Sequence, residues 1–210
     1  MRRSYPELVS YIVTLMTPRA YTQGKRAEAT ARSRRAIVVA AQTLFRDEGR
    51  FELPLEEVAE RAGCSTRTVI RQFGSKEGLL AAAIADAEQG VMAARGAEPG
   101  EVATAIRRLV DHYEETGDQV LGWLALASRY PLVRRVTESG TRLHEEWVET
   151  VFGSDLADLE RGARRQRRAV LAALTDVYLW ELLRRRQGLT RARTEAAMLD
   201  LVEHARGTGA

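Results

Sequence analysis

The sequence is short of the residues that build most disulfide, metal and cofactor sites. Its 210 residues include one cysteine, three histidines and five prolines, and only 6% are aromatic. A single cysteine, Cys64, excludes an internal disulfide and fits a reducing cytosol. With 45% apolar and 29% charged residues, the composition is that of a globular protein that can bury a core. The abundance of Ala, Leu, Arg and Glu favours helix.

Motifs of the common enzyme classes are also missing. His144 and Glu145 begin like the helix of zinc peptidases, but Val148 stands where the second histidine is needed. There is no Walker glycine–lysine loop, no dinucleotide fingerprint and no nucleophile elbow. Three scattered histidines and a lone cysteine do not make a metal cluster. We therefore expect no catalytic residue, no cofactor and no bound metal.

No stretch of the sequence reaches the length of a membrane span. The first twenty residues, MRRSYPELVSYIVTLMTPRA, pair arginines with a short apolar stretch, which is too short to cross a bilayer. Tyr11 and Thr14 interrupt this stretch, and no small-x-small cleavage site follows it, so we do not expect a signal peptide. A helical extension and a translation start at Met16 both remain open. We expect a cytoplasmic protein without a membrane partner.

Positive charges only slightly outnumber negative charges, but the excess is unevenly distributed along the chain. The net charge is +3; residues 1–80 hold 14 Lys and Arg against 9 Asp and Glu, whereas residues 81–210 hold 18 against 20. A basic front end on a near-neutral body indicates a polyanionic partner. Charge alone fits a solvated terminal tail equally well.

The apolar residues are spaced for helices, and strand-like alternation is almost absent. From Arg32 they recur at helical spacing as far as a stop at Gly49. Three further helices have marked starts: Pro54 at the first position of the second, Ser65 as the cap of the third and Ser75 as the cap of the fourth. After a break at 95–100 the pattern predicts helices near 101–116, 118–129, 131–152, 156–187 and 190–205.

Residues 55–73 have the layout of a helix-turn-helix. Ala59 is small enough for two helices to cross closely, and Gly63 permits the tight turn. Val69 and Phe73 direct apolar groups toward the preceding helices, which leaves a polar outward face of Thr66, Arg67, Thr68 and Arg71. These hydrogen-bond donors suit phosphates and base edges, and Arg is the usual reader of guanine. A helical hairpin with solvated arginines is the alternative.

Two segments, RRAIVVAAQTLFRDEG and EEVAERAGCSTRTVIRQFGSKEGLL, resemble the tetracycline-repressor (TetR) family of bacterial one-component regulators. The resemblance covers about residues 32–85. It implies that 66–73 is the recognition helix, and that Lys76 and the amides at the start of the fourth helix hold a DNA phosphate. The residues expected to bind DNA are Arg34, Ser65, Thr66, Arg67, Thr68, Arg71 and Lys76.

Three positions depart from the family pattern. Ile70 stands where a DNA-contacting tyrosine is usual, so it can supply only packing or a contact to a thymine methyl. Pro54 replaces a threonine, which weakens a capping or phosphate contact. Cys64 replaces a common valine in the turn, where a small residue that fills space is favoured over a redox sensor.

The resemblance also implies that the last two long helices pair with those of a second copy. The residues expected at this homodimer interface are Leu171, Leu174, Tyr178, Leu182, Met198, Leu201 and Val202. One short recognition helix reads few base pairs, whereas two related by a twofold axis read a palindrome with half-sites about 34 Å apart. A monomer with these helices in its core is the alternative.

By the same analogy, residues 101–155 bind a small-molecule effector. The candidate ligand-binding residues are Trp123, His144, Trp147, Phe152 and Tyr178, because effector pockets are apolar with a few polar groups. Each of them also fits an ordinary core position. Neither the effector nor the operator can be named from the sequence.

The sequence thus predicts an all-α regulator. An extension over 1–30 precedes a three-helix helix-turn-helix DNA-binding domain over 31–80. A long helix joins this domain to a larger effector-binding and dimerisation bundle over 81–210. We expect a ligand-responsive repressor that binds a palindromic operator on double-stranded DNA as a homodimer. The alternative is a small-molecule-binding or protein-interaction dimer with degenerate DNA binding, which Ile70 favours.

Overall fold

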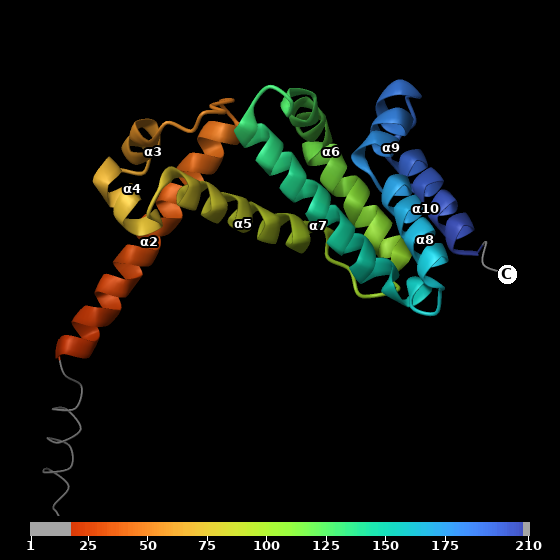
Figure 1. Cartoon of the computed structure of the whole chain (residues 1–210), viewed down its shortest axis with the longest axis horizontal. Helices are drawn as coiled ribbons and strands as arrows, with labels where there is room; N and C mark the ends of the chain where they lie inside the picture. The colour runs from red at the N-terminus through yellow and green to blue at the C-terminus, as the bar shows by residue number, and fades with distance from the viewer. Residues whose placement is uncertain (1–17, 208–210) are drawn as a thin grey trace, which may run out of the picture. The chain divides into compact units, whose positions relative to one another are not determined.

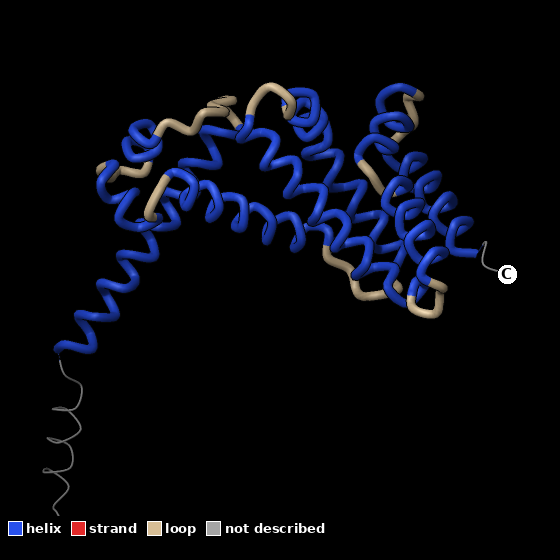
Figure 2. The backbone as a smooth tube through the Cα atoms, viewed as in Figure 1, coloured by secondary structure: helices blue, strands red, loops and turns tan. Residues whose placement is uncertain are grey.

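The computed structural model describes residues 18–207, with side chains from residue 24 onward, and every regular element in this range is helical. Figures 1 and 2 show these helices and the loops that join them. The predicted all-α fold is confirmed. The expectations for the first 17 residues, including a start at Met16, lie outside the described residues. Among residues 18–207, no helix combines the length and apolarity that a membrane span requires.

The described part of the chain divides into two compact units, with the boundary between Ala83 and Ile84. The first contains α2 (Pro18–Arg46), α3 (Leu55–Arg61), α4 (Thr66–Phe73) and the first part of α5 (Lys76–Arg95). α2 begins well before the expected position near residue 32. The core of this unit is apolar and includes Ile37, Leu44, Val58, Val69 and Leu79, all fully buried.

Local capping explains where the short helices of the first unit begin. The Ser65 hydroxyl accepts a hydrogen bond from the Thr68 amide at 3.2 Å, and the Ser75 hydroxyl accepts one from the Gly78 amide at 3.1 Å. Both predicted caps are therefore confirmed, since each satisfies an amide that its helix leaves unpaired. Pro54 was expected at the first helical position but lies one residue earlier, with extended backbone and no side-chain cap.

The second unit contains the rest of α5 and six further elements. These are α6 (Val102–Leu126), α7 (Pro131–Leu156), α8 (Arg161–Leu174), α9 (Val177–Glu181) with the π-helical turn η1 (Leu182–Arg186), and α10 (Arg191–Gly207). The breaks expected between residues 116 and 118 and after residue 152 do not occur. Gly117 lies inside α6, where its missing side chain makes room for Trp180, and α7 continues past Gly153.

The expectation of a single helix over 156–187 is also wrong, because the chain leaves the helical conformation between α8 and α9. The Thr175 hydroxyl donates to the Leu171 carbonyl at 2.7 Å and closes the end of α8. Asp176 then caps α9, its carboxylate accepting from the Tyr178 amide at 2.9 Å. Side chains that bond to nearby backbone in this way offer an alternative to continuous helix. The apolar pattern runs through this point and hides the break.

Candidate nucleic-acid interface and ligand pocket

The turn between α3 and α4 holds these two helices close together. Ala59 is buried, and its carbonyl accepts a hydrogen bond from the Cys64 amide at 2.9 Å. Gly63 has φ +65°, a conformation that residues with a side chain rarely adopt. The chain can therefore reverse within four residues and present α4 beside α3.

α4 has a buried side and a polar exposed side. Val69 is completely buried, whereas Arg67 and Arg71 are exposed. Thr66 and Thr68 are half-buried, and the Thr68 hydroxyl lies 3.0 Å from that of the exposed Ser65. Ile70 joins the exposed side, with 38% of its area accessible. The predicted outward face is thus built around two arginines.

The arginines of the first unit differ in their ionic partners. Arg61 on α3 pairs with Glu48, and Arg50 pairs with Glu57, with 2.9 Å between Arg50 Nε and Glu57 Oε2. Arg67 and Arg71, in contrast, have no carboxylate within 4.0 Å among residues 24–207. Their charges are therefore available to an external anion, whereas those near α3 are already compensated.

Arg34 has a structural role that the sequence did not indicate. Its Nη1 atom donates to the Gln72 carbonyl at 2.8 Å, and its guanidinium carbon lies 4.2 Å from the centroid of the Phe73 ring. The Gln72 amide in turn donates to the Ser33 hydroxyl at 2.9 Å. A cation at the end of α4 also suits the negative end of the helix dipole. Arg34 thus holds α4 against α2, and its predicted phosphate contact stays a prediction.

The start of α5 supplies a further cationic position. Lys76 is the first residue of α5 and is exposed, with no ion pair inside the described part of the chain. The amides of a helix's first turn and a nearby ammonium together favour an anion such as phosphate. The phosphate contact expected of Lys76 stays a prediction.

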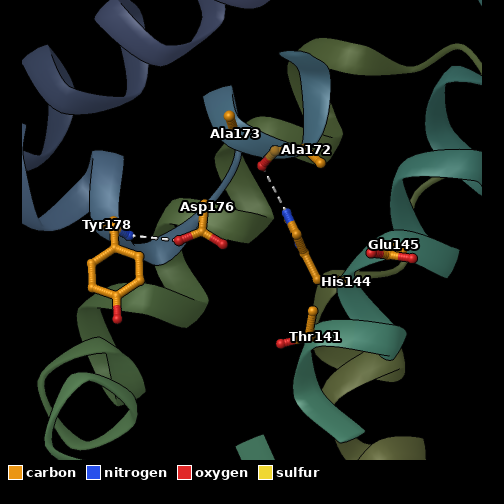
Figure 3. Close-up of a pocket in the computed structure, with 7 residues that line it drawn as sticks. All are labelled: Thr141, His144, Glu145, Ala172, Ala173, Asp176 and Tyr178. Carbon is orange, nitrogen blue, oxygen red and sulfur yellow. Dashed lines mark hydrogen bonds between the residues drawn. The ribbon is translucent and has the colours of Figure 1, made fainter. Parts of the chain in front are cut away.

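The second unit has an open pocket of about 350 Å³ between α7 and the α8–α9 turn. Figure 3 shows Thr141, His144 and Glu145 on α7 along one side of it, and Asp176 and Tyr178 across from them. Ala172 and Ala173 complete the lining. Two carboxylates, an imidazole and a phenol give this pocket a polar rim.

Two of the five predicted ligand-binding residues, His144 and Tyr178, line this pocket. Trp123 does not. Trp147 and Phe152 are buried in the core and touch each other edge to face, with 6.0 Å between ring centroids. They were expected in a pocket lining, but neither lines this one. Trp147 still lies close to it, because its ring stacks on that of His144 at 5.7 Å.

A cluster of buried polar groups lies beside this pocket, and sequence reasoning missed its Arg95. Arg95, at the end of α5, is only 7% exposed, and His112 on α6 is 9% exposed. Burial together with the positive charge of Arg95 lowers the pKa of His112 to about 4. Burial raises the pKa of Tyr113 to about 12. A lone arginine near the predicted helix end was the only signal for this cluster in the sequence.

The same unit exposes apolar side chains on its last helices. Val170 on α8, Tyr178 on α9, Leu182 on η1 and Leu201 on α10 are each between 41% and 56% exposed. Large apolar groups in such number often mark a contact surface. Three of them belong to the predicted dimer interface.

Other residues of the predicted interface lie elsewhere. Leu171, Met198 and Val202 are completely buried within their own unit, and Leu174 is half-buried against the same core. The three buried side chains cannot touch a partner, which corrects the sequence-based expectation. Helical periodicity identified an apolar helix but did not tell its inner side from its outer side.

Comparison with known proteins finds one matching family and solved structures with a similar fold. Residues 37–83 match the model of the family described as bacterial regulatory proteins, tetR family. A transcriptional regulator from Rhodococcus sp. RHA1 has a similar structure, with 17% sequence identity and a TM-score of 0.54 over 82% of this chain and 95% of its own. No protein of curated function matches the sequence significantly.

A second solved structure, from Rhodococcus sp. and described as a TetR-family transcriptional regulator, has 19% identity and a TM-score of 0.56. That similarity covers 83% of this chain and 99% of the other. At these identities the likeness concerns the fold, whereas the family match concerns the helices that carry Arg67 and Arg71.

Proposed function

Because residues 37–83 place this chain in the TetR family of bacterial regulatory proteins, we propose that it is a cytoplasmic, ligand-responsive repressor. As a homodimer it binds a palindromic operator on double-stranded DNA. A small molecule in the second unit favours a conformation that releases the operator. Release requires that this molecule has different affinities for the two conformations.

The exposed side of α4 carries this proposal. Arg67 and Arg71 are solvent-exposed and lack carboxylate partners in the described residues, while Val69 on the opposite side anchors the helix in the core. Exposed, uncompensated arginines on a helix held by a tight turn suit a major groove. Lys76 adds a phosphate contact at the start of α5.

The exposed apolar residues of α8, α9, η1 and α10 support the homodimer. A twofold interface uses the same surface of both copies, so one apolar patch per chain is sufficient. We retain Tyr178, Leu182 and Leu201 as interface residues and add Val170, which is exposed on α8. The half-buried Leu174 contributes at its edge.

Selection of bound fragments from a randomised duplex library, followed by a band-shift assay on the selected site, tests the proposal. We expect a palindromic site, and an affinity that falls steeply with salt because phosphate contacts release counterions. Arg67→Ala should weaken binding about tenfold or more, because a base contact contributes about 1–3 kcal/mol. Lys76→Ala should reduce the dependence of affinity on salt by about one counterion.

Arg142→Ala is the matched control, since it removes one positive charge from an exposed position on α7. It should leave the affinity unchanged. If the wild-type protein selects no sequence, and its DNA binding does not depend on salt, the DNA-binding function is refuted. The alternative of a dimer with degenerate DNA binding, which the exposed Ile70 favours, would then hold.

A further inference from the structure

Arg95 is a buried cation without a counter-ion. It is the last residue of α5, it is only 7% exposed, and no carboxylate lies within 4.0 Å of its guanidinium among residues 24–207. Its Nε atom is buried and has no hydrogen-bond partner. Burying a charge is costly unless the charge is paired and hydrogen-bonded. The position of Arg95 therefore calls for a compensating group.

The neighbours of Arg95 offset this cost only in part. Its guanidinium carbon lies 5.0 Å from the centroid of the Tyr113 ring, a favourable cation–π distance. Asp176 attracts it from beyond 4.0 Å, but this carboxylate already caps α9 by accepting from the Tyr178 amide. Burial remains the largest influence and lowers the pKa of Arg95. A full negative charge in contact with the guanidinium is missing.

A second buried polar atom lacks a partner nearby, the Nδ1 atom of His144. The Nε2 atom of the same ring lies 3.2 Å from the Ala172 carbonyl and 3.2 Å from the Thr175 hydroxyl. Because a carbonyl only accepts, Nε2 carries the proton and Nδ1 keeps a free lone pair. Unpartnered buried groups are rare in native proteins. The Nδ1 lone pair of His144 requires a hydrogen-bond donor, whereas the Arg95 guanidinium, which only donates, requires an acceptor.

Short contacts connect these two groups with the open pocket. His144 lines the pocket and contacts Thr175. The Thr175 carbonyl accepts from the Tyr113 hydroxyl at 3.0 Å, and the Tyr113 ring lies against Arg95. On the other side Trp147 stacks on His144, and its Nε1 donates to the Arg95 carbonyl at 3.1 Å. The pocket is thus connected to the buried cation through His144 and the residues that contact it.

We propose that this cluster is the effector site and that the effector is a small organic acid whose carboxylate pairs with Arg95. A guanidinium matches a carboxylate with two parallel hydrogen bonds. The apolar body of the acid lies against the His144 ring, which Trp147 supports from the core by stacking on it, and the pocket of about 350 Å³ is in the range of small-molecule sites. The inference rests on the ligand response proposed above and specifies its chemistry.

The position of Arg95 also gives the effector a route to the DNA-binding residues. α5 is one helix of 20 residues, with Lys76 at its first position and Arg95 at its last. An anion that draws Arg95 toward the pocket acts directly on the end of this helix. The same helix holds the proposed phosphate contact at its other end.

Thermal unfolding of the full chain tests the site with three carboxylates of increasing size, acetate, benzoate and octanoate, each compared with its own amide. We expect at least one carboxylate to raise Tm by about 2–4 °C when it is present in excess. Its amide, which has a similar shape and no charge, should leave Tm unchanged. If all three carboxylates leave Tm unchanged, the proposal is wrong.

Arg95→Met should abolish the carboxylate response and raise the Tm of the protein without added acid, because it removes an uncompensated buried charge. The matched control is Arg184→Met, since Arg184 is also partly buried but pairs with Glu114 at 2.8 Å. This control should lower Tm and keep the carboxylate response. The proposal is overturned if Arg95→Met lowers Tm as the control does, or still responds to the acid.

These measurements contain no DNA, so they are independent of the operator assay. Loss of the carboxylate response with intact operator binding would refute only the acid site. A carboxylate response that depends on Arg95, without operator binding, would refute only the regulatory function.

Discussion

Gly117 and Trp180 show how a single missing side chain fixes the packing of the second unit. Trp180 is fully buried, and its indole Nε1 donates to Glu114 Oε1 at 3.0 Å. A Cβ atom on Gly117 would lie 2.4 Å from Cζ3 of this indole. A glycine is therefore required at position 117, in the middle of α6, because only glycine leaves room for the Trp180 indole. It is found there although glycine usually disfavours helix.

Gly117→Ala should destabilise the protein by about 1–3 kcal/mol, because the added methyl group forces the buried indole to move. Gly122→Ala on the same helix is the control, since a Cβ there meets no atom within 4 Å. It should be neutral or stabilising by up to about 1 kcal/mol, from helix propensity alone. Urea unfolding of the two variants gives both values. Equal stability of the two would contradict this packing.

His112 makes stability depend on pH in a defined direction. Its pKa is about 4 in the folded chain, compared with about 6.5 for an unperturbed imidazole. Between these values the unfolded chain binds more protons, so stability increases with pH. The contribution of His112 is full above about pH 6.5 and is lost as pH falls toward 4.

Below about pH 6, His112→Gln should lose less stability with falling pH than the wild-type chain, by up to about 1.4 kcal/mol per pH unit. The free energy of unfolding in urea, measured at several pH values, gives this slope. His204→Gln, at an exposed position of α10, is the control. An identical slope for His112→Gln and the wild type would count against the folded-state pKa of His112.

At the scale of elements, the junction of α4 and α5 decides how the end of α4 is held. Gly74 ends α4 with φ +78°, and Ser75 caps α5 through the Gly78 amide. Gly78 packs so tightly that a Cβ atom there would lie 2.0 Å from the Phe73 carbonyl oxygen. A backbone atom cannot move aside as the end of a flexible side chain can. The end of α4 and the start of α5 are therefore held in a fixed arrangement.

Gly78→Ala should shift the start of α5 away from the end of α4, costing about 1–3 kcal/mol of stability. Operator affinity should fall as well, because the shift displaces Lys76 and the last turn of α4 together. Gly90→Ala, also on α5 but with no atom within 4 Å of its Cβ position, should leave affinity unchanged. Thermal unfolding and a band shift measure the two effects. Wild-type affinity for Gly78→Ala would argue against a rigid junction.

At the scale of the whole molecule, the exposed apolar residues of α8 to α10 form the proposed homodimer interface. Leu201→Glu places a charge in the proposed interface and should convert the homodimer into a monomer, since an unpaired buried charge opposes association. Light scattering coupled to gel filtration should show the mass fall by half. Operator affinity should fall by about a hundredfold or more, because two linked half-site contacts become one.

Val39→Glu is the control for this change. Val39 is also an exposed apolar residue, 45% accessible, but it lies on α2 in the other unit. Its variant should remain a dimer. If both variants or neither are monomeric, the interface does not lie on α8 to α10.

The sequence by itself determined the all-α class, the helix-turn-helix at 55–73 and the caps at Ser65 and Ser75. These features depend on residues within one or two turns of each other, so local spacing is sufficient to identify them. The outward direction of Arg67 and Arg71 follows from the same spacing once Val69 is buried.

Only the tertiary structure decided which apolar residues of the last helices are core and which are surface. It also decided that α6 runs through Gly117, that Thr175 and Asp176 interrupt a helix, and that Arg95 is buried without a counter-ion. The burial of these residues and the course of α6 depend on contacts between residues far apart in the sequence, such as Gly117 with Trp180 and Arg95 with Tyr113. The break at Thr175 and Asp176 is local, but the continuous apolar pattern hides it. Burial is a property of the packed chain, and helical periodicity alone does not contain it.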